Sequence, residues 1–192
     1  DQGTQVANDS FDVLVTDAAG GTTTTTVSID VVVDSVVASL TSTGTGNWDV
    51  TSTWTPALVP TASDDVEVLG IHTVTVTGAP QAGNTLSVLG GGQVTINQPL
   101  TIDDWIAADG GSVLDIQAAL TFGTKLSTTG DVNWNGAAVD GLVWLAEGDI
   151  NALTSATHIL DARLNIDGGT VDIRGPIQGS GELDIRAGTV TL

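Results

Sequence analysis

A short pattern, a glycine followed two residues later by an aliphatic residue, returns six times at nearly constant spacing. The copies lie at Gly92/Val94, Gly111/Val113, Gly130/Val132, Gly148/Ile150, Gly169/Val171 and Gly188/Val190. Successive glycines are 19, 19, 18, 21 and 19 residues apart. Such regularity is typical of stacked structural repeats, because each unit buries its apolar face only against its neighbours. This spacing constrains the fold more than any other feature.

Within each repeat, apolar and polar residues alternate on both sides of the glycine. The best copies are residues 164–173 and 183–192. Alternation with a period of two indicates a strand with one buried face, and the glycine permits a sharp corner between two strands. A third apolar pair follows in several repeats, for example Leu120 and Phe122. Three short strands in about 19 residues predict the coil of a parallel β-solenoid.

The aliphatic residues of the pattern are expected to face inward and to stack into one column. The predicted column is Val94, Val113, Val132, Ile150, Val171 and Val190. The glycines predicted to form the corners are Gly92, Gly111, Gly130, Gly169 and Gly188. Ser112, one residue before Val113, is expected to face outward. A β-sandwich is the alternative fold, but a sandwich has no reason to repeat one motif in register.

The charge is strongly negative and unevenly distributed. Four basic against 23 acidic residues give a net charge of −19, and all four bases lie beyond residue 124. Such a surface repels phosphate backbones, so nucleic acid and anionic membranes are poor partners. It suits solubility, cation binding or a salty environment. The chain lacks cysteine, and no apolar run approaches the roughly 20 residues of a membrane span, which predicts no membrane insertion.

Residues 1–40 differ from the repeats. Residues 10–16 alternate as a strand, residues 17–21 have the composition of a turn, and residues 22–33 form a second strand rich in threonine and valine. Residues 9–17, the Gly-Gly turn and residues 27–31 resemble the closing hairpin of bacterial cadherin-like, immunoglobulin-like repeats. That resemblance implies a partial immunoglobulin-like hairpin in a giant secreted adhesin, at the bacterial cell surface, with Ca²⁺ bound between domains.

Calcium is the one cofactor that the sequence supports. Four acids lie at strand ends and turns of the N-terminal segment: Asp9, Asp17, Asp30 and Asp34. Hard oxygen ligands from such positions suit Ca²⁺. Solvated turn acids are the alternative interpretation.

Residues 41–65 are predicted to be a linker followed by a cap on the first coil. The stretch from Trp48 to Pro56, with Trp54 between them, resembles the start of β-solenoid segments in autotransporter-like secreted proteins. Two indoles can cover the open end of a solenoid core, and prolines cannot pair with an intruding strand. A sugar-stacking platform is the alternative role for this Trp pair. Residues 66–192 are predicted to be the solenoid, which we expect to continue beyond residue 192.

Few side chains suggest catalysis. The pairs Asp64/Asp65 and Asp103/Asp104 point to opposite strand faces, so neither forms an acid–base dyad alone. The two histidines, His72 and His158, have no companion at metal-ligand spacing. The least regular stretch, residues 123–157, is expected to form a loop or a widened coil.

The sequence therefore predicts a structural or adhesive segment of a secreted bacterial surface protein or extracellular fibre, without catalysis. Expected partners are further domains of the same long chain, neighbouring protomers and surface glycans. The alternative is a β-helix that binds or degrades polysaccharides, as a lyase, a hydrolase or a tailspike-like protein does.

Overall fold

The chain divides into two compact units, Asp1–Val36 and Val37–Leu192. The structure is a computed structural model and describes residues 7–31 and 37–191. The second unit begins at Val37, four residues before residue 41, where the sequence predicts the end of the N-terminal segment. Both units are built from strands, which confirms the all-β class.

The first unit is an antiparallel hairpin. Strand β1 (Ala7–Thr16) pairs with β2 (Thr22–Val31), and Thr16 lies opposite Thr22. Asp17 closes the turn, because its Oδ1 accepts hydrogen bonds from the backbone N–H groups of Ala19 (2.9 Å) and Gly21 (2.8 Å). The hairpin follows from β-branched residues on both strands and a Gly-containing turn between them.

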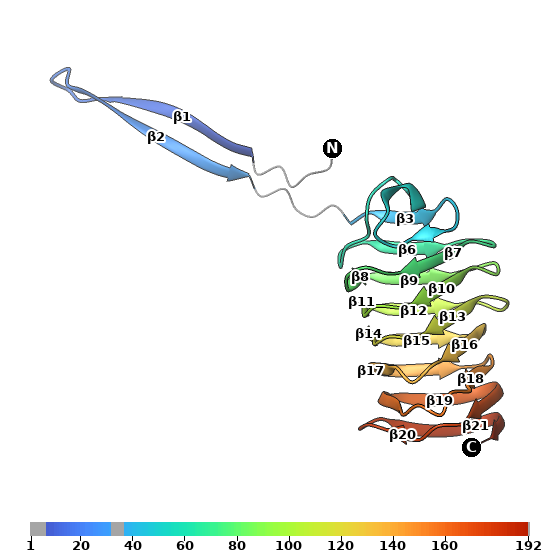
Figure 1. The fold of residues 1–192 in the computed structure, drawn as a ribbon. Coiled ribbons are helices and arrows are strands. Elements are labelled where there is room, and N and C mark those ends of the chain that lie inside the picture. The colour runs from blue at the N-terminus through green and yellow to red at the C-terminus, as the bar shows by residue number, and fades with distance from the viewer. Residues whose placement is uncertain (1–6, 32–36, 192) are drawn as a thin grey trace. The chain divides into compact units, whose positions relative to one another are not determined.

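The second unit is a parallel β-solenoid, as the spacing predicts. Successive coils stack in register (Figure 1), and their strands form three parallel faces. On the first face lie β3 (Ser39–Ser42), β6 (Asp65–Val68), β9 (Thr85–Val88), β12 (Trp105–Ala108) and β15 (Lys125–Thr128). On the second lie β4 (Gly46–Asn47), β7 (Thr73–Val76), β10 (Gln93–Ile96), β13 (Val113–Ile116), β16 (Asp131–Trp134) and β18 (Ile150–Ala152). On the third lie β8 (Gln81–Gly83), β11 (Leu100–Ile102), β14 (Leu120–Phe122) and β20 (Ile177–Gln178).

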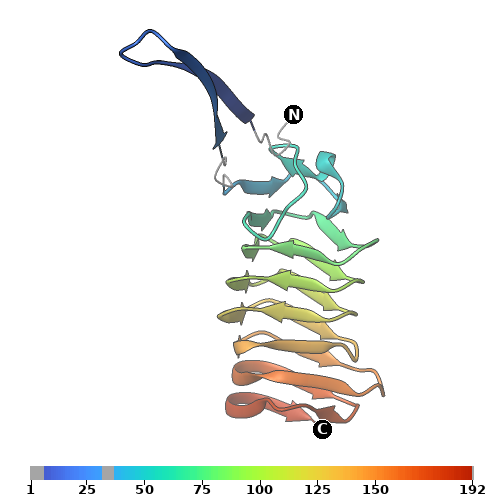
Figure 2. The ribbon, with the colours of Figure 1, turned by 90° about the vertical axis from the view of Figure 1, so that its left-hand side faces the viewer.

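Towards the C-terminal end, the strands run around the corners. β17 (Ala138–Ala146), β19 (His158–Ile173) and β21 (Glu182–Thr191) each pair on more than one face. The turned view shows the same stack from its side (Figure 2). From β6 onward, strands pair in parallel with those of neighbouring coils, so the parallel pairing runs from β3 to β21.

One core fills the solenoid. On the second face, the inward column runs through consecutive register partners Val74, Val94, Leu114, Val132, Ile150, Val171 and Val190. The members from Val74 to Val171 are fully buried. Steps of 18 to 21 residues separate them.

The predicted position of Val113 in this column is wrong. Leu114 pairs with Val94 and is 0% exposed, whereas Val113 pairs with Gln93 and is only half-buried. The prediction that Ser112 faces outward is wrong as well, since Ser112 is 0% exposed and its hydroxyl donates to Asp109 Oδ1 (2.6 Å). Two consecutive glycines, Gly110 and Gly111, allow the corner in either register, and the structure adopts the one that buries the larger leucine.

Residues 41–47, whose composition is that of a linker and which open the predicted linker and cap, belong to the first coil. β3 pairs in parallel with β6, and β4 pairs in parallel with β7. A 3-10 turn, η1 (Thr51–Thr53), leads to β5 (Trp54–Thr55), which pairs antiparallel with β3. The coil stack therefore begins at Ser39, whereas the sequence predicts that it begins at residue 66.

Residues 123–157, predicted to be irregular, contain complete coils. Their irregularity is a bulge in β17 between Asp140 and Val143. The interior there is filled by Trp134 and Trp144, both fully buried, with ring centroids 5.8 Å apart in an edge-to-face arrangement. The large rings replace the aliphatic residues of other coils, which explains the weak repeat signal in the sequence.

Candidate functional site

A shallow groove of about 230 Å³ lies on the first face of the solenoid, close to its first coils. It crosses β3, β6, β9 and β12, which are consecutive neighbours in the parallel sheet. Its lining residues are Ser39, Asp65, Val66, Glu67, Thr85, Ser87 and Trp105. Six of the seven occupy outward positions of their strands, and Val66 alone belongs to the core.

The strand register places the groove side chains in two outward columns. Asp65 lies beside Ser39 on one side and Thr85 on the other, and Trp105 follows in the same column. Glu67 lies in the second column, beside Ser87. Asp65 and Glu67 share one face because residues two apart on a strand point the same way.

Hydrogen bonds fix the Asp65 carboxylate. Its Oδ1 accepts from Asn84 Nδ2 (2.9 Å) and from the Thr85 hydroxyl (2.8 Å). Glu67 Oε2 accepts a long contact of 3.5 Å from the Thr41 hydroxyl. Asp65 is therefore held in place, whereas Glu67 is more weakly restrained. Both carboxylates offer acceptor positions towards the groove.

Trp105 differs from the other four tryptophans of the chain. Trp48, Trp54, Trp134 and Trp144 are at most 2% exposed and belong to the core. Trp105 takes an outward strand position and is half-buried. Its neighbour in the next coil is the exposed Lys125. A large ring at an outward position of a strand gains little for the core, and here it forms a wall of the groove.

Sequence reasoning missed this constellation. It noted Asp65 only as half of an acidic pair, and it did not compare Trp105 with residues two coils away. The signal was present, because Asp-Val-Glu places two acids on one strand face and Trp105 follows Asp65 by two coil lengths. The register that brings them together becomes evident only from the stack.

Of the acids predicted to bind Ca²⁺, the three that the structure describes, Asp9, Asp17 and Asp30, are not all brought together. The hairpin places Asp17 at its tip, while Asp9 and Asp30 lie towards the opposite end of the ladder. Eight residues of strand separate Asp9 from Asp17, which corresponds to roughly 26 Å. Asp34 lies outside the described residues. In the described part of the chain, no three His, Cys, Asp or Glu side chains gather as a metal-binding group.

The Trp48 and Trp54 rings pack edge to face, with centroids 5.4 Å apart, at the start of the solenoid. They are 0% and 2% exposed, and Trp54 Nε1 donates to the Trp48 carbonyl oxygen (2.8 Å). Rings buried this deeply fit the capping interpretation. They present no open face on which a sugar could stack, which argues against the alternative platform.

Four of the predicted corner glycines, Gly92, Gly130, Gly169 and Gly188, lie close to the backbone of the preceding coil, whereas an added Cβ at Gly111 would meet nothing within 4 Å. Gly169 and Gly188 have positive φ of 66° and 91°. An added Cβ at Gly188 would lie 2.6 Å from the carbonyl oxygen of Gly169 in the preceding coil. Gly148 and Gly169 show the same relation, so these corners form a glycine stack. In the coil before Gly130, the residue aligned with this glycine is Ser112. The predicted Gly111 lies in the turn next to it.

Carboxylates also cap backbone groups between coils. Hydrogen bonds from the Ser112 hydroxyl and the Gly90 N–H lower the pKa of Asp109 below its ordinary value. Those from the Ser180 N–H and hydroxyl do the same for the pKa of Asp161. Each carboxylate thus links its own coil to a neighbouring coil or turn.

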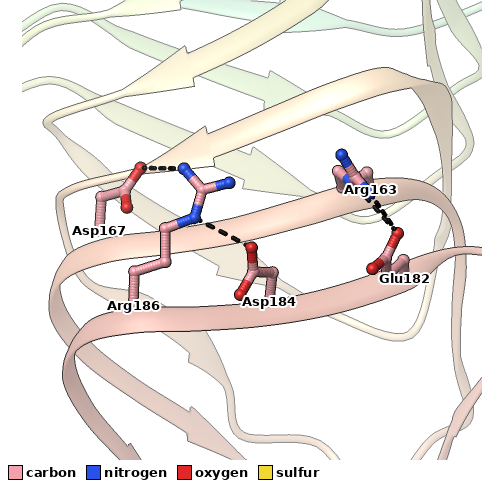
Figure 3. A network of polar contacts seen from close by, with 5 residues as sticks. All are labelled: Arg163, Asp167, Glu182, Asp184 and Arg186. Atoms are coloured by element: carbon pink, nitrogen blue, oxygen red, sulfur yellow. Dashed lines mark hydrogen bonds and ion pairs between the residues drawn. The ribbon is translucent and has the colours of Figure 1, made fainter.

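Exposed ion pairs gather on the last coils (Figure 3). Arg163 donates to Glu182 (2.7 Å), and Arg186 lies 2.9 Å from Asp184 and 3.8 Å from Asp167. The hydrogen bond to Glu182 raises the pKa of Arg163 above its ordinary value. Exposed pairs of this kind contribute little stability each, so they indicate surface ladders rather than a catalytic centre.

His158 is a buried polar residue that the sequence did not single out beyond excluding a zinc site. It is 0% exposed, lies 4.9 Å from the Trp134 ring by centroid, and its Nδ1 accepts from the Gly136 N–H (3.1 Å). These contacts tie a turn to the core.

Comparisons with known proteins leave the family open. No protein-family model matches the chain, and searches of curated proteins and of solved structures also give no match. Across residues 7–31 and 37–191, no helix is long and apolar enough to span a membrane. Any function proposed for the chain therefore rests on the fold and the groove.

Proposed function

We propose that the chain is a structural and adhesive segment of a secreted bacterial surface protein or extracellular fibre, without catalysis. The observation that carries this proposal is the registered stack from β3 to β21, in which every coil rests on its neighbour. Such a scaffold extends by adding coils and presents continuous side-chain columns, which suits display and contact with a surface.

The outer surface supports an extracellular role. Hydrogen bonds between polar side chains of successive coils, such as Asn135 to Asp115 (2.9 Å) and Thr124 to Asp104 (2.7 Å), connect the coils from outside. The net charge of −19 favours solubility at high salt. For the N-terminal hairpin, we propose a partial immunoglobulin-like module whose acids bind Ca²⁺.

As partners we propose other parts of the same long protein, neighbouring protomers and surface glycans.

A polysaccharide-degrading β-helix is the second candidate, because the groove brings Asp65 and Glu67 to one face. Glycoside hydrolysis uses two carboxylates flanking the scissile bond. Asp65 is committed to two hydrogen bonds within the protein, which favours a binding or structural role over proton transfer.

Display on a non-adherent bacterial host tests the proposal. Cells that carry residues 1–192 on their surface are expected to attach to glycan-coated or cell-coated plates more than cells that carry an unrelated acidic β-protein. The same protein, incubated with neutral and acidic polysaccharides, is expected to release no reducing ends. If the parent protein released reducing ends and the Glu67→Gln variant did not, the chain would be an enzyme instead.

A further inference from the structure

We propose that the groove between Asp65, Glu67 and Trp105 is a subsite for one neutral sugar ring of a glycan. The proposal rests on the adhesive role proposed above and names the ligand class of that role. The aromatic wall contacts the apolar face of the sugar, and the carboxylates accept hydrogen bonds from its hydroxyl groups.

The dimensions fit a single ring. Asp65 and Trp105 lie two coils apart, which corresponds to about 10 Å at the usual spacing of neighbouring strands. The volume of 230 Å³ lies below the roughly 300–1,000 Å³ of pockets that take drug-sized ligands. Because the groove is shallow, the rest of a glycan chain would continue along the solenoid surface.

The polar lining suits hydroxyl groups. An ionised carboxylate has about four acceptor positions, and Asn84 and Thr85 fill only two of those of Asp65. Ser39, Thr85 and Ser87 add hydroxyls, which both donate and accept. A sugar ring presents several adjacent groups that do the same.

The charge selects a neutral sugar. Two carboxylates line the groove, and no basic residue does. A uronic acid, a sulfated sugar or a phosphate would be repelled at this distance. A cationic peptide would be attracted to the carboxylates and to the indole. It would, however, leave the serine and threonine hydroxyls without matching partners, so the lining favours a sugar.

Trp105 is the residue on which the proposal depends most. Outward strand positions near the groove hold small or polar side chains, such as Ser39, Thr85 and Ser87. An indole there excludes water from one side of the groove and supplies a large amphipathic contact at low cost in side-chain entropy.

The test is direct binding to the whole 192-residue chain. The probes are an array of neutral oligosaccharides built from glucose, galactose, mannose and N-acetylglucosamine, together with oligogalacturonate and a lysine-rich peptide. The affinity of each hit is then measured by titration calorimetry. We expect at least one neutral oligosaccharide to bind and oligogalacturonate not to bind.

Three variants locate the contact. Trp105→Ala and Glu67→Gln are each expected to weaken binding about tenfold or more, as loss of an aromatic contact or of a hydrogen bond to a charged group does. Trp105→Phe keeps an aromatic face and should retain part of the affinity. Asp131→Asn, the same type of change at an exposed position on another face, should leave binding within about twofold.

Acrylamide quenching gives an independent readout. Because the other four tryptophans are at most 2% exposed, accessible fluorescence comes mainly from Trp105. A saturating neutral oligosaccharide should reduce the quenching, whereas Asp131→Asn should not change this protection. Should Trp105→Ala fail to fold, Glu67→Gln and the quenching data still decide the question.

Three results would overturn the groove proposal: no neutral oligosaccharide binds, the lysine-rich peptide alone binds, or the groove variants bind like the parent. If cells that display the Trp105→Ala variant attach as well as cells that display the parent protein, the adhesive role stands and the groove is not the binding site. Oligosaccharide binding without cell attachment would keep the groove and reject the adhesive role.

Discussion

The hairpin and the solenoid share one local pattern and differ in what that pattern buries. Both alternate apolar and polar residues along their strands. In the hairpin, Leu14 and Val15 are 63% and 50% exposed. In the solenoid, Val94 and Leu114 are 0% exposed, because the coils before and after cover them. Alternation thus specifies a strand, and stacking in register decides whether its apolar face becomes a core.

The largest expected effect separates these two regions with one type of substitution. Leu114→Asp places a carboxylate between Val94 and Val132 without a partner, and should lower the free energy of unfolding by about 3–5 kcal/mol or unfold the adjacent coils. Leu14→Asp replaces an exposed side chain and should change the solenoid melt by less than about 0.5 kcal/mol. Urea unfolding followed by circular dichroism measures both.

The neighbouring residue provides the control for register. Val113→Asp changes an outward, half-buried position and should cost clearly less than Leu114→Asp. Equal losses for the two variants would contradict the pairing of Leu114 with Val94.

A second expected effect concerns backbone contact between coils. In Gly148→Ala, the new Cβ would meet the carbonyl oxygen of Gly130, and the corner must shift. We expect a loss of about 1–3 kcal/mol, as for other overpacked sites. Gly110→Ala adds a methyl group where nothing lies within 4 Å, and should be nearly neutral. Thermal melts of both variants provide the measurement, and a silent Gly148→Ala would show that the corners do not touch.

Much of this architecture could be predicted from the sequence, since the glycine spacing predicts the solenoid and most of its inward column. The register at Val113 could not be predicted, because the pairs Gly110-Gly111 and Val113-Leu114 allow two equivalent alignments. Nor could the early start of the stack at β3, since residues 41–47 have the composition of a linker. The groove depends on side chains two coils apart, and a strand pattern alone does not pair them.

We expect the stability of the solenoid to decrease at acid pH because of the carboxylates at its corners. Asp109 and Asp161 have pKa values lowered in the folded state by hydrogen bonds from Ser112 and Gly90 and from Ser180. Their stabilising contribution is therefore fully present above the unfolded pKa, near 3.9, and is lost as the pH falls through the lower folded values. Melting temperatures measured from pH 6 to pH 2 should decline below about pH 4.

The double variant Asp109→Asn/Asp161→Asn tests this assignment. It should lower the melting temperature at pH 6 and flatten the decline at acid pH, because the two carboxylates no longer take up protons. An unchanged acid profile would assign the decline to other carboxylates. Asp131→Asn, the same change at an exposed acid on the second face, serves as the control.

The smallest expected effect is the stabilisation of the hairpin by Ca²⁺. If its acids bind Ca²⁺, the ion stabilises only the state that presents the ligands, and the shift grows with concentration over the dissociation constant. Because the register separates Asp17 from Asp9 and Asp30, any site is incomplete within one hairpin and should be weak.

We expect 5 mM Ca²⁺ to raise hairpin protection in hydrogen exchange more than Na⁺ at matched ionic strength, and EDTA to reverse it. Asp9→Asn should remove the difference, and Asp17→Asn should not, because Asp17 already accepts two backbone hydrogen bonds in the turn. Identical exchange in Ca²⁺ and Na⁺ would leave these acids as solvated charges, and the coil stack, which does not involve them, would keep its stability in either salt.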